Sequence, residues 1–144
     1  PDASLDGFNG FFLVAVSGQS ATLIANRPVP LQQPISQGIH SLSNGTPAEP
    51  WPRRERLEIA LATWLEGDAE DPADLFALLR PDYDDPEGPV FINAPVYGTR
   101  CSTVVAIDHD GAGWICERRF DEGGEVVGEV ALDFDWLSGY ASFP

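Results

Sequence analysis

The chain has 144 residues, of which 43% are hydrophobic, so it is one domain in length and long enough to bury a core. Its formal net charge of −15 argues against a nucleic-acid surface and against an anionic membrane face, because both require basic residues. All eight basic residues are arginines, which excludes chemistry that needs a lysine. No apolar run is long enough to span a membrane and no signal peptide opens the chain, so we expect a soluble, cytoplasmic protein.

Three strands are expected in the first third of the chain. Residues 10–26 contain two apolar runs on either side of a polar turn at residues 17–20, which is the pattern of a β-hairpin. Residues 27–34 are rich in proline, and we interpret them as a loop because proline is excluded from central strands. Residues 35–44 then predict a short third strand that ends in polar residues, and residues 45–50 predict a loop.

Two consecutive helices are expected next. Residues 51–66 carry apolar side chains at the spacing of an amphipathic helix, and Gly67 is suited to end it. A second helix is predicted for residues 71–80, where Asp71 can act as the N-cap and Pro72 takes the first helical position. The apolar positions of the first helix are Leu57, Ala60, Leu61, Trp64 and Leu65.

Three further strands are predicted near residues 102–108, 113–120 and 125–134, after an acidic loop at residues 81–88. The segments HDGAG and DEGGE between them are rich in glycine and typical of hairpin turns. Strands linked by hairpins form antiparallel sheets, and the helix pair would cover one face. The sequence therefore predicts an α+β fold with antiparallel strands, two consecutive helices and more strand than helix.

No local catalytic motif is present, because the chain lacks a GxSxG serine, a phosphate-binding loop and the HExxH pair of zinc proteases. Polar residues do occur at the ends of apolar strands, namely Asn9, Asn44 and Arg100. Each has an ordinary structural interpretation, as a turn or cap residue or as a surface ion-pair partner. Together they could instead surround one pocket and stabilise an oxyanion. Both interpretations stay open.

Two acidic segments raise the question of a metal site. DHDGAG at residues 108–113 resembles a calcium loop but lacks the later glutamate ligand, so we predict a hairpin turn with a solvated His109. We interpret the acidic run at residues 82–87 as a solvated loop, with metal binding as the alternative. No metal site is predicted.

Three ordered segments resemble the NRDE-type family, also known as the transport and Golgi organisation protein 2 family. FNGFFLVAV (residues 8–16) is similar to its YNGFNL strand, and GIHSLSNGTPAEPWPRRERL (residues 38–57) is similar to its GLSN…PW segment. YGTRCSTVVAIDHDGAGWICERRFDEGG (residues 97–124) is similar to its segment that begins with YGTR. The resemblance covers most of the chain. It implies that residues 1–144 are the C-terminal part of a single domain whose N-terminal half is absent.

The resemblance also implies a fold and a site. The family looks like a branch of the N-terminal-nucleophile hydrolases, which form a four-layer αββα sandwich. In that class a chain-terminal Cys, Ser or Thr attacks an amide, and its own α-amino group acts as the base. Asn44 matches the oxyanion-hole asparagine of cholylglycine-hydrolase-like relatives, and Arg100 matches the arginine beside their nucleophile. The second asparagine of the family's NGFN is Phe12 here, which puts a polar role at that position in doubt.

The residues around Arg100 have structural interpretations. Tyr97, Thr99 and Thr103 are expected to form the turn and strand start that fix Arg100. Cys101 is internal and therefore cannot be the chain-terminal nucleophile, and we interpret it as an ordinary buried strand thiol.

Two functions follow from the resemblance. The first is hydrolysis of an amide C–N bond by an N-terminal cysteine outside this chain. The alternative is a non-catalytic module that binds and carries haem or a lipid, in transport and Golgi organisation. No cofactor is expected for the first function, whereas haem ligation in the second would use His40, Cys101 or Cys116. The expected partners are a small-molecule ligand or substrate and the N-terminal half of the same protein, with homo-oligomerisation left open.

The strand at residues 11–16 is apolar on both faces, and such strands need cover on both sides. We therefore expect this half alone to be inactive and weakly stable, with a complementary chain or an apolar self-interface over the strand. Exposing apolar side chains forfeits about 1.5–3 kcal/mol each, which is comparable with a total stability of about 5–15 kcal/mol.

Overall fold

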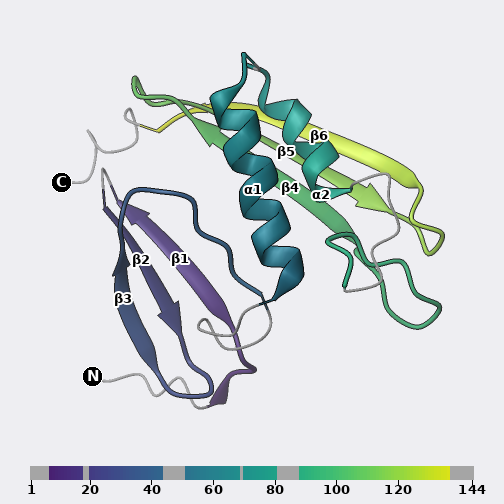
Figure 1. Ribbon diagram of the computed structural model, residues 1–144, viewed down its shortest axis with the longest axis horizontal. Helices are drawn as coiled ribbons and strands as arrows, with labels where there is room; N and C mark the ends of the chain where they lie inside the picture. The colour runs from purple at the N-terminus through teal and green to yellow at the C-terminus, as the bar shows by residue number, and fades with distance from the viewer. Residues whose placement is uncertain (1–6, 18–19, 44–50, 69, 81–87, 137–144) are drawn as a thin grey trace.

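The structure is a computed structural model that describes residues 7–17, 20–43, 51–68, 70–80 and 88–136 (Figure 1). Within these residues the chain forms two antiparallel three-stranded sheets and two α-helices. The elements are β1 (Phe12–Ser17), β2 (Ser20–Ala25), β3 (Leu31–Ile35), α1 (Pro52–Glu66), the 3-10 turn η2 (Pro72–Asp74), α2 (Leu75–Leu79), β4 (Cys101–Ile107), β5 (Ala112–Phe120) and β6 (Val126–Asp135). The predicted α+β class, element order and antiparallel pairing are confirmed. The αββα sandwich stays a prediction.

The N-terminal sheet has the strand order β1-β2-β3, and β1 and β2 form the predicted hairpin. The predicted position of the third strand is wrong. β3 covers Leu31–Ile35, so all of it except Ile35 lies in the segment interpreted as a proline-rich loop, and it includes Pro34. Among the described strands β3 is bonded only to β2, so it is an edge strand. An edge strand tolerates proline because the missing N–H need not break a ladder hydrogen bond.

Both predicted helices are present: α1 begins at Pro52, and the second begins as the 3-10 turn η2 at Pro72, its predicted first helical position. α1 ends at Gly67, whose backbone N–H donates to the carbonyl of Trp64. Before α2, the carboxylate of Asp71 accepts a hydrogen bond from the backbone N–H of Ala73 at 2.8 Å, which confirms the predicted N-cap. The second helix is shorter than predicted, because it starts as a 3-10 turn and ends at Leu79. Arg80 leaves the helical region because it precedes a proline, which disfavours helical backbone angles.

A buried core cluster lies between α2 and the C-terminal sheet, whose order is β4-β5-β6. Val104 of β4 and Cys116 of β5 are opposite each other in the register, and both pack against Phe76 of α2. Leu79 and Trp114 border this cluster. Figure 1 shows both helices over one face of the sheet, as predicted for the helix pair. We name this the helix-covered face.

The opposite face of the C-terminal sheet, which we name the far face, is polar around Thr103, Glu117 and Arg119 and apolar beyond them. It carries the alternate residues of each strand, and these include exposed apolar side chains in β4 and β6. They are Val105, Ile107, Val130 and Leu132, and half-buried Ile115 lies opposite Leu132 in the register. Gly113 also belongs to this face, and the ring of Phe134 covers it so closely that a β-carbon there would meet the ring.

Two hairpin turns of the same design link the strands of this sheet. Asp108 accepts hydrogen bonds from the backbone N–H groups of Asp110 and Ala112, both at 2.9 Å. Asp121 does the same in the next turn, where it accepts from Gly123 and Glu125. These contacts confirm that DHDGAG is a hairpin turn, and His109 is exposed in it as predicted.

Strand β1 is exposed on both sides. Leu13 faces one side of the N-terminal sheet, Val14 and Val16 face the other, and all three are exposed in the structure. The described residues therefore leave open the surfaces for which the sequence predicts cover.

Candidate functional site

The predicted catalytic pair is described only in part. Asn44 lies outside the described residues. Arg100 is exposed at the entrance of β4 and lines a small cavity of about 160 Å³ between the loop at residues 92–100 and the turn after β5. Two carboxylates, Asp121 and Glu122, line the same cavity, whereas Asn9 does not. The convergence of these residues on an oxyanion pocket stays a prediction.

The loop before Arg100 is fixed by its own hydrogen bonds. The N–H of Thr99 donates to the carbonyl of Ile92 at 2.8 Å, and the Thr99 hydroxyl accepts from the N–H of Ile92 at 3.0 Å. The carbonyl of Tyr97 accepts from Ala94, and the carbonyl of Arg100 accepts from the N–H of Phe120 at 2.9 Å. The Thr99 side chain thus holds the predicted turn, whereas Tyr97 takes part through its backbone carbonyl and its side chain is exposed. Thr103 is exposed and contacts the carboxylate of Glu117.

The two cysteines differ in exposure. Cys101 is exposed, so its interpretation as a buried thiol is wrong. The reason is that side chains alternate between the two faces of a strand, and this alternation places Cys101 on the far face of β4. Cys116 is the buried thiol, and burial raises its pKa above the ordinary value of 9.0, with Glu129 raising the pKa further and Arg118 lowering it. A thiol held protonated in this way is a poor nucleophile.

Asn26 is a functional-looking residue that the sequence interpretation missed. It follows β2 and is only 4% exposed. Its side-chain oxygen accepts from the N–H of Phe11 at 2.9 Å, and its amide nitrogen donates to the carbonyls of Phe8 and Asn9 at 3.3 and 3.1 Å. In the sequence, the signal for this residue was an asparagine directly after an apolar strand. These contacts give Asn26 a structural role, which is to fix the chain where it enters β1.

A larger cavity of about 820 Å³ lies between the N-terminal sheet and α1, and we name it the α1 groove. Apolar side chains line it from both sides, and they are Val14, Leu23 and Ile35 from the sheet and Leu61 and Leu65 from the helix. The segment at residues 36–42 forms another wall, which includes His40. The ring nitrogen Nε2 of His40 lies 2.9 Å from the carbonyl of Ser36.

Polar groups gather at the Ser41 side of the α1 groove. The Ser41 hydroxyl donates to the carboxylate of Glu58 and accepts from the side chain of Arg54 at 3.0 Å. Ser41 and Arg54 both line the groove. The groove therefore combines an apolar body with a hydrogen-bonding end.

The described residues contain no group of three or more His, Cys, Asp or Glu side chains suited to hold a metal ion. The acidic run at residues 82–87 lies outside the described residues. Neither helix in the described part of the chain has the length and apolar character to cross a membrane.

The described chain is thus an α+β protein in which a helix pair covers one antiparallel sheet and a second sheet borders an apolar groove. Among known families, the model of Transport and Golgi organisation 2 matches residues 2–122. The match covers most of the 144 residues, and the chain belongs to this family. It extends from upstream of β1 to the turn after β5. No curated protein matches the chain.

Proposed function

We propose that this protein is a non-catalytic module that binds an apolar small molecule in the α1 groove. The observation that carries the proposal is the groove itself, with about 820 Å³ of space and apolar side chains on two opposite walls. Pockets for small organic ligands are mostly apolar and measure about 300–1,000 Å³, with a few polar groups that fix orientation. The Ser41–Arg54 end supplies such groups.

A lipid-like ligand fits the groove better than haem does. Of the three residues considered for haem ligation, Cys116 is in the core, Cys101 is on the far face, and only His40 lines the groove. Because a carbonyl only accepts hydrogen bonds, the contact with Ser36 places the hydrogen of His40 on Nε2 and leaves Nδ1 as the ring nitrogen that could bind iron. Because His40 is a single candidate ligand in a groove lined mainly by apolar side chains, we propose an acyl chain as the ligand class.

One leucine and one isoleucine of α1 provide a matched test. Leu65 lines the groove and is 58% exposed, whereas Ile59 is 66% exposed on the same helix and does not line it. We expect Leu65→Ser to weaken binding of the fluorescent fatty acid cis-parinaric acid about fivefold, because part of a leucine contact of about 1.5–3 kcal/mol is lost. Ile59→Ser should bind as the unchanged protein does. Equal binding by both variants, or no binding by the unchanged protein, would refute the proposal. A Soret shift with hemin that His40→Ala abolishes would favour haem instead.

Amide hydrolysis is the second hypothesis, and it rests on Arg100. For this hypothesis the nucleophile must come from outside the chain, because Cys101 is internal and the Cys116 thiol is buried. Arg100 would then act electrostatically from its small cavity, next to a loop that its backbone hydrogen bonds hold in place. Replacing the N-terminal cysteine of the full-length protein should abolish turnover of acyl-amide substrates if this hypothesis holds.

We further propose that the chain is the C-terminal half of a larger domain. The support is the exposed apolar surface on the far face and on β1. Contact of this apolar surface with water is unfavourable in free energy, so a packing partner would stabilise the protein. A second β-sheet, from the N-terminal half of the same protein or from another copy, has the shape and chemistry to pack on the far face.

A further inference from the structure

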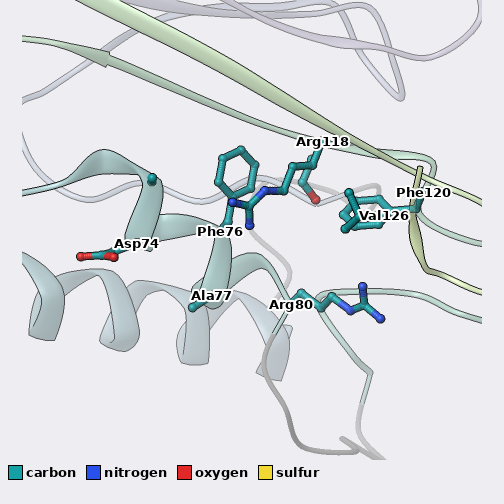
Figure 2. Close-up of a pocket in the computed structure, with 9 residues that line it drawn as sticks. Asp74, Phe76, Ala77, Arg80, Arg118, Phe120 and Val126 are labelled. Carbon is teal, nitrogen blue, oxygen red and sulfur yellow. The ribbon is translucent and has the colours of Figure 1, made fainter. Parts of the chain in front are cut away.

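A second cavity, of about 570 Å³, lies on the helix-covered face and is separate from the α1 groove. We name it the arginine cavity. Figure 2 shows its lining, which comes from α2 and the residue after it on one side and from the C-terminal sheet on the other. The residues that matter for its chemistry are Phe76, Arg80, Ser102, Arg118, Phe120 and Val126.

Each of the two arginines is held by aromatic rings. The guanidinium carbon of Arg118 lies 4.1 Å from the centre of the Phe76 ring. Figure 2 shows the two side chains next to each other. The guanidinium carbon of Arg80 lies 4.8 Å from the ring centre of Phe91 and 5.7 Å from that of Phe120. Stacking occupies the faces of a guanidinium and leaves the N–H groups at its edge able to donate hydrogen bonds. The rings therefore position the arginines without using their donors.

The two arginines differ in how firmly a carboxylate holds them. Arg118 donates from its Nε to Glu129 on the neighbouring strand β6. Within the described residues, the carboxylate paired with Arg80 is that of Glu125, in a loose ion pair at 3.8 Å, and the Glu125 side chain is 79% exposed. A distance of 3.8 Å is too long for a hydrogen bond, so the Arg80 donors are not satisfied by this carboxylate. An incoming anion can replace Glu125 at little cost, whereas Arg118 stays as a fixed wall.

The surroundings of Arg80 also restrict the ligand. Phe120 and Val126 present apolar surface in the same cavity, and the Ser102 hydroxyl adds one donor. Asp74 is the one carboxylate among the described residues that line the cavity, and it points away from both guanidinium groups in Figure 2. The chain carries a charge of −15, which repels a dianion more than a monoanion.

We propose that the arginine cavity binds a monoanionic organic acid with an apolar ring or chain. The anionic group of the ligand accepts hydrogen bonds from Arg80, and its apolar body lies against Phe120 and Val126. This site is independent of the α1 groove, so the two proposals stand or fall separately.

Calorimetric titration with three small ligands tests the chemistry. Naphthalene-2-carboxylate combines the ring and the charge, 2-naphthamide has the ring alone, and inorganic phosphate has charge without a ring. We expect the carboxylate to bind at least about tenfold more tightly than either of the others, because charge-assisted hydrogen bonds and apolar burial act together. Comparable binding of 2-naphthamide or phosphate, or no measurable binding of the carboxylate, would overturn the proposal.

Two pairs of variants locate the site. Arg80→Gln should remove the advantage of the carboxylate, whereas Arg119→Gln, with the same change in charge on the far face of β5, should keep it. Because Arg80 also stacks on aromatic rings, a second pair protects the test against misfolding. Val126→Asp places a carboxylate in the cavity, and Val127→Asp places one at the adjacent position, which does not line it. Both valines are exposed, so both variants should fold. If Val126→Asp binds naphthalene-2-carboxylate as well as Val127→Asp does, the site is not the arginine cavity.

Discussion

Replacing Asn26 with alanine should detach the start of β1. The side chain of Asn26 is buried and spans three backbone groups in a segment about fifteen residues earlier in the chain, from Phe8 to Phe11. The alanine side chain has no donor or acceptor, so the N–H of Phe11 and the carbonyl of Asn9 lose this partner, whereas the carbonyl of Phe8 keeps a hydrogen bond from Arg27 at 3.4 Å. The segment before β1 then has fewer contacts that tie it to the end of β2.

The expected loss of stability follows from these three hydrogen bonds. A hydrogen bond contributes about 0.5–1.5 kcal/mol net, so three of them correspond to about 2–4 kcal/mol. The three partner groups are only partly buried, so water can solvate them after the substitution, which favours the lower end of the range. We therefore expect Asn26→Ala to lower the free energy of unfolding by about 2 kcal/mol.

Urea unfolding followed by far-UV circular dichroism measures this loss, and amide hydrogen exchange shows where it occurs. The N–H of Phe11 should exchange faster in the variant, because its acceptor is gone. Asn93→Ala is the matched control, since exposed Asn93 makes a single side-chain hydrogen bond, to the carbonyl of Gly123. This control should lower the free energy of unfolding by less than about 1 kcal/mol and leave the exchange rate of the Phe11 N–H unchanged. An Asn26→Ala variant as stable as the Asn93→Ala variant, with Phe11 still protected, would refute this reasoning.

Three further predictions concern the cysteines and the far face. In the native protein 5,5′-dithiobis(2-nitrobenzoate) should label only Cys101, with Cys116 reacting after denaturation, and a second fast thiol would contradict the assigned burial. Because the pKa of Cys116 is raised on folding, its contribution to stability is complete below the unfolded pKa and is lost as the pH rises above about 9. Stability should therefore fall less steeply with alkaline pH in Cys116→Ala than in the unchanged protein, and parallel curves would argue against this. If a second copy covers the far face, sedimentation equilibrium should show self-association. Leu132→Thr should weaken the association, whereas Val96→Thr, in the exposed loop before β4, should leave it unchanged. A strictly monomeric protein would exclude that interface.

The elements of the fold were predictable where the information is local. The 3.6-residue period of α1, the Asp71–Pro72 start of the second helix and the glycine turns between the last strands are each encoded within a few residues, and all are present. The prediction for β3 is wrong because of Pro34, since a proline is excluded from a central strand but not from an edge strand. Whether a strand lies at the edge of a sheet depends on its neighbours in space, which the local sequence does not show. The predicted second helix extends to residue 80, whereas the helix ends at Leu79. The proline after Arg80 is a local signal for this end.

The sequence by itself determined the α+β class, the hairpins and the family, because hydrophobic periodicity, turn chemistry and ordered motifs are properties of the chain. The tertiary structure decided which face each residue occupies. Cys101 and Cys116 are both in strands, and only the packing of Phe76 on one face makes Cys116 the buried thiol. Arg80 and Arg118 are far apart in sequence, and they share a cavity only because α2 lies across the C-terminal sheet. Such juxtapositions depend on contacts between distant segments, which no local pattern of residues specifies.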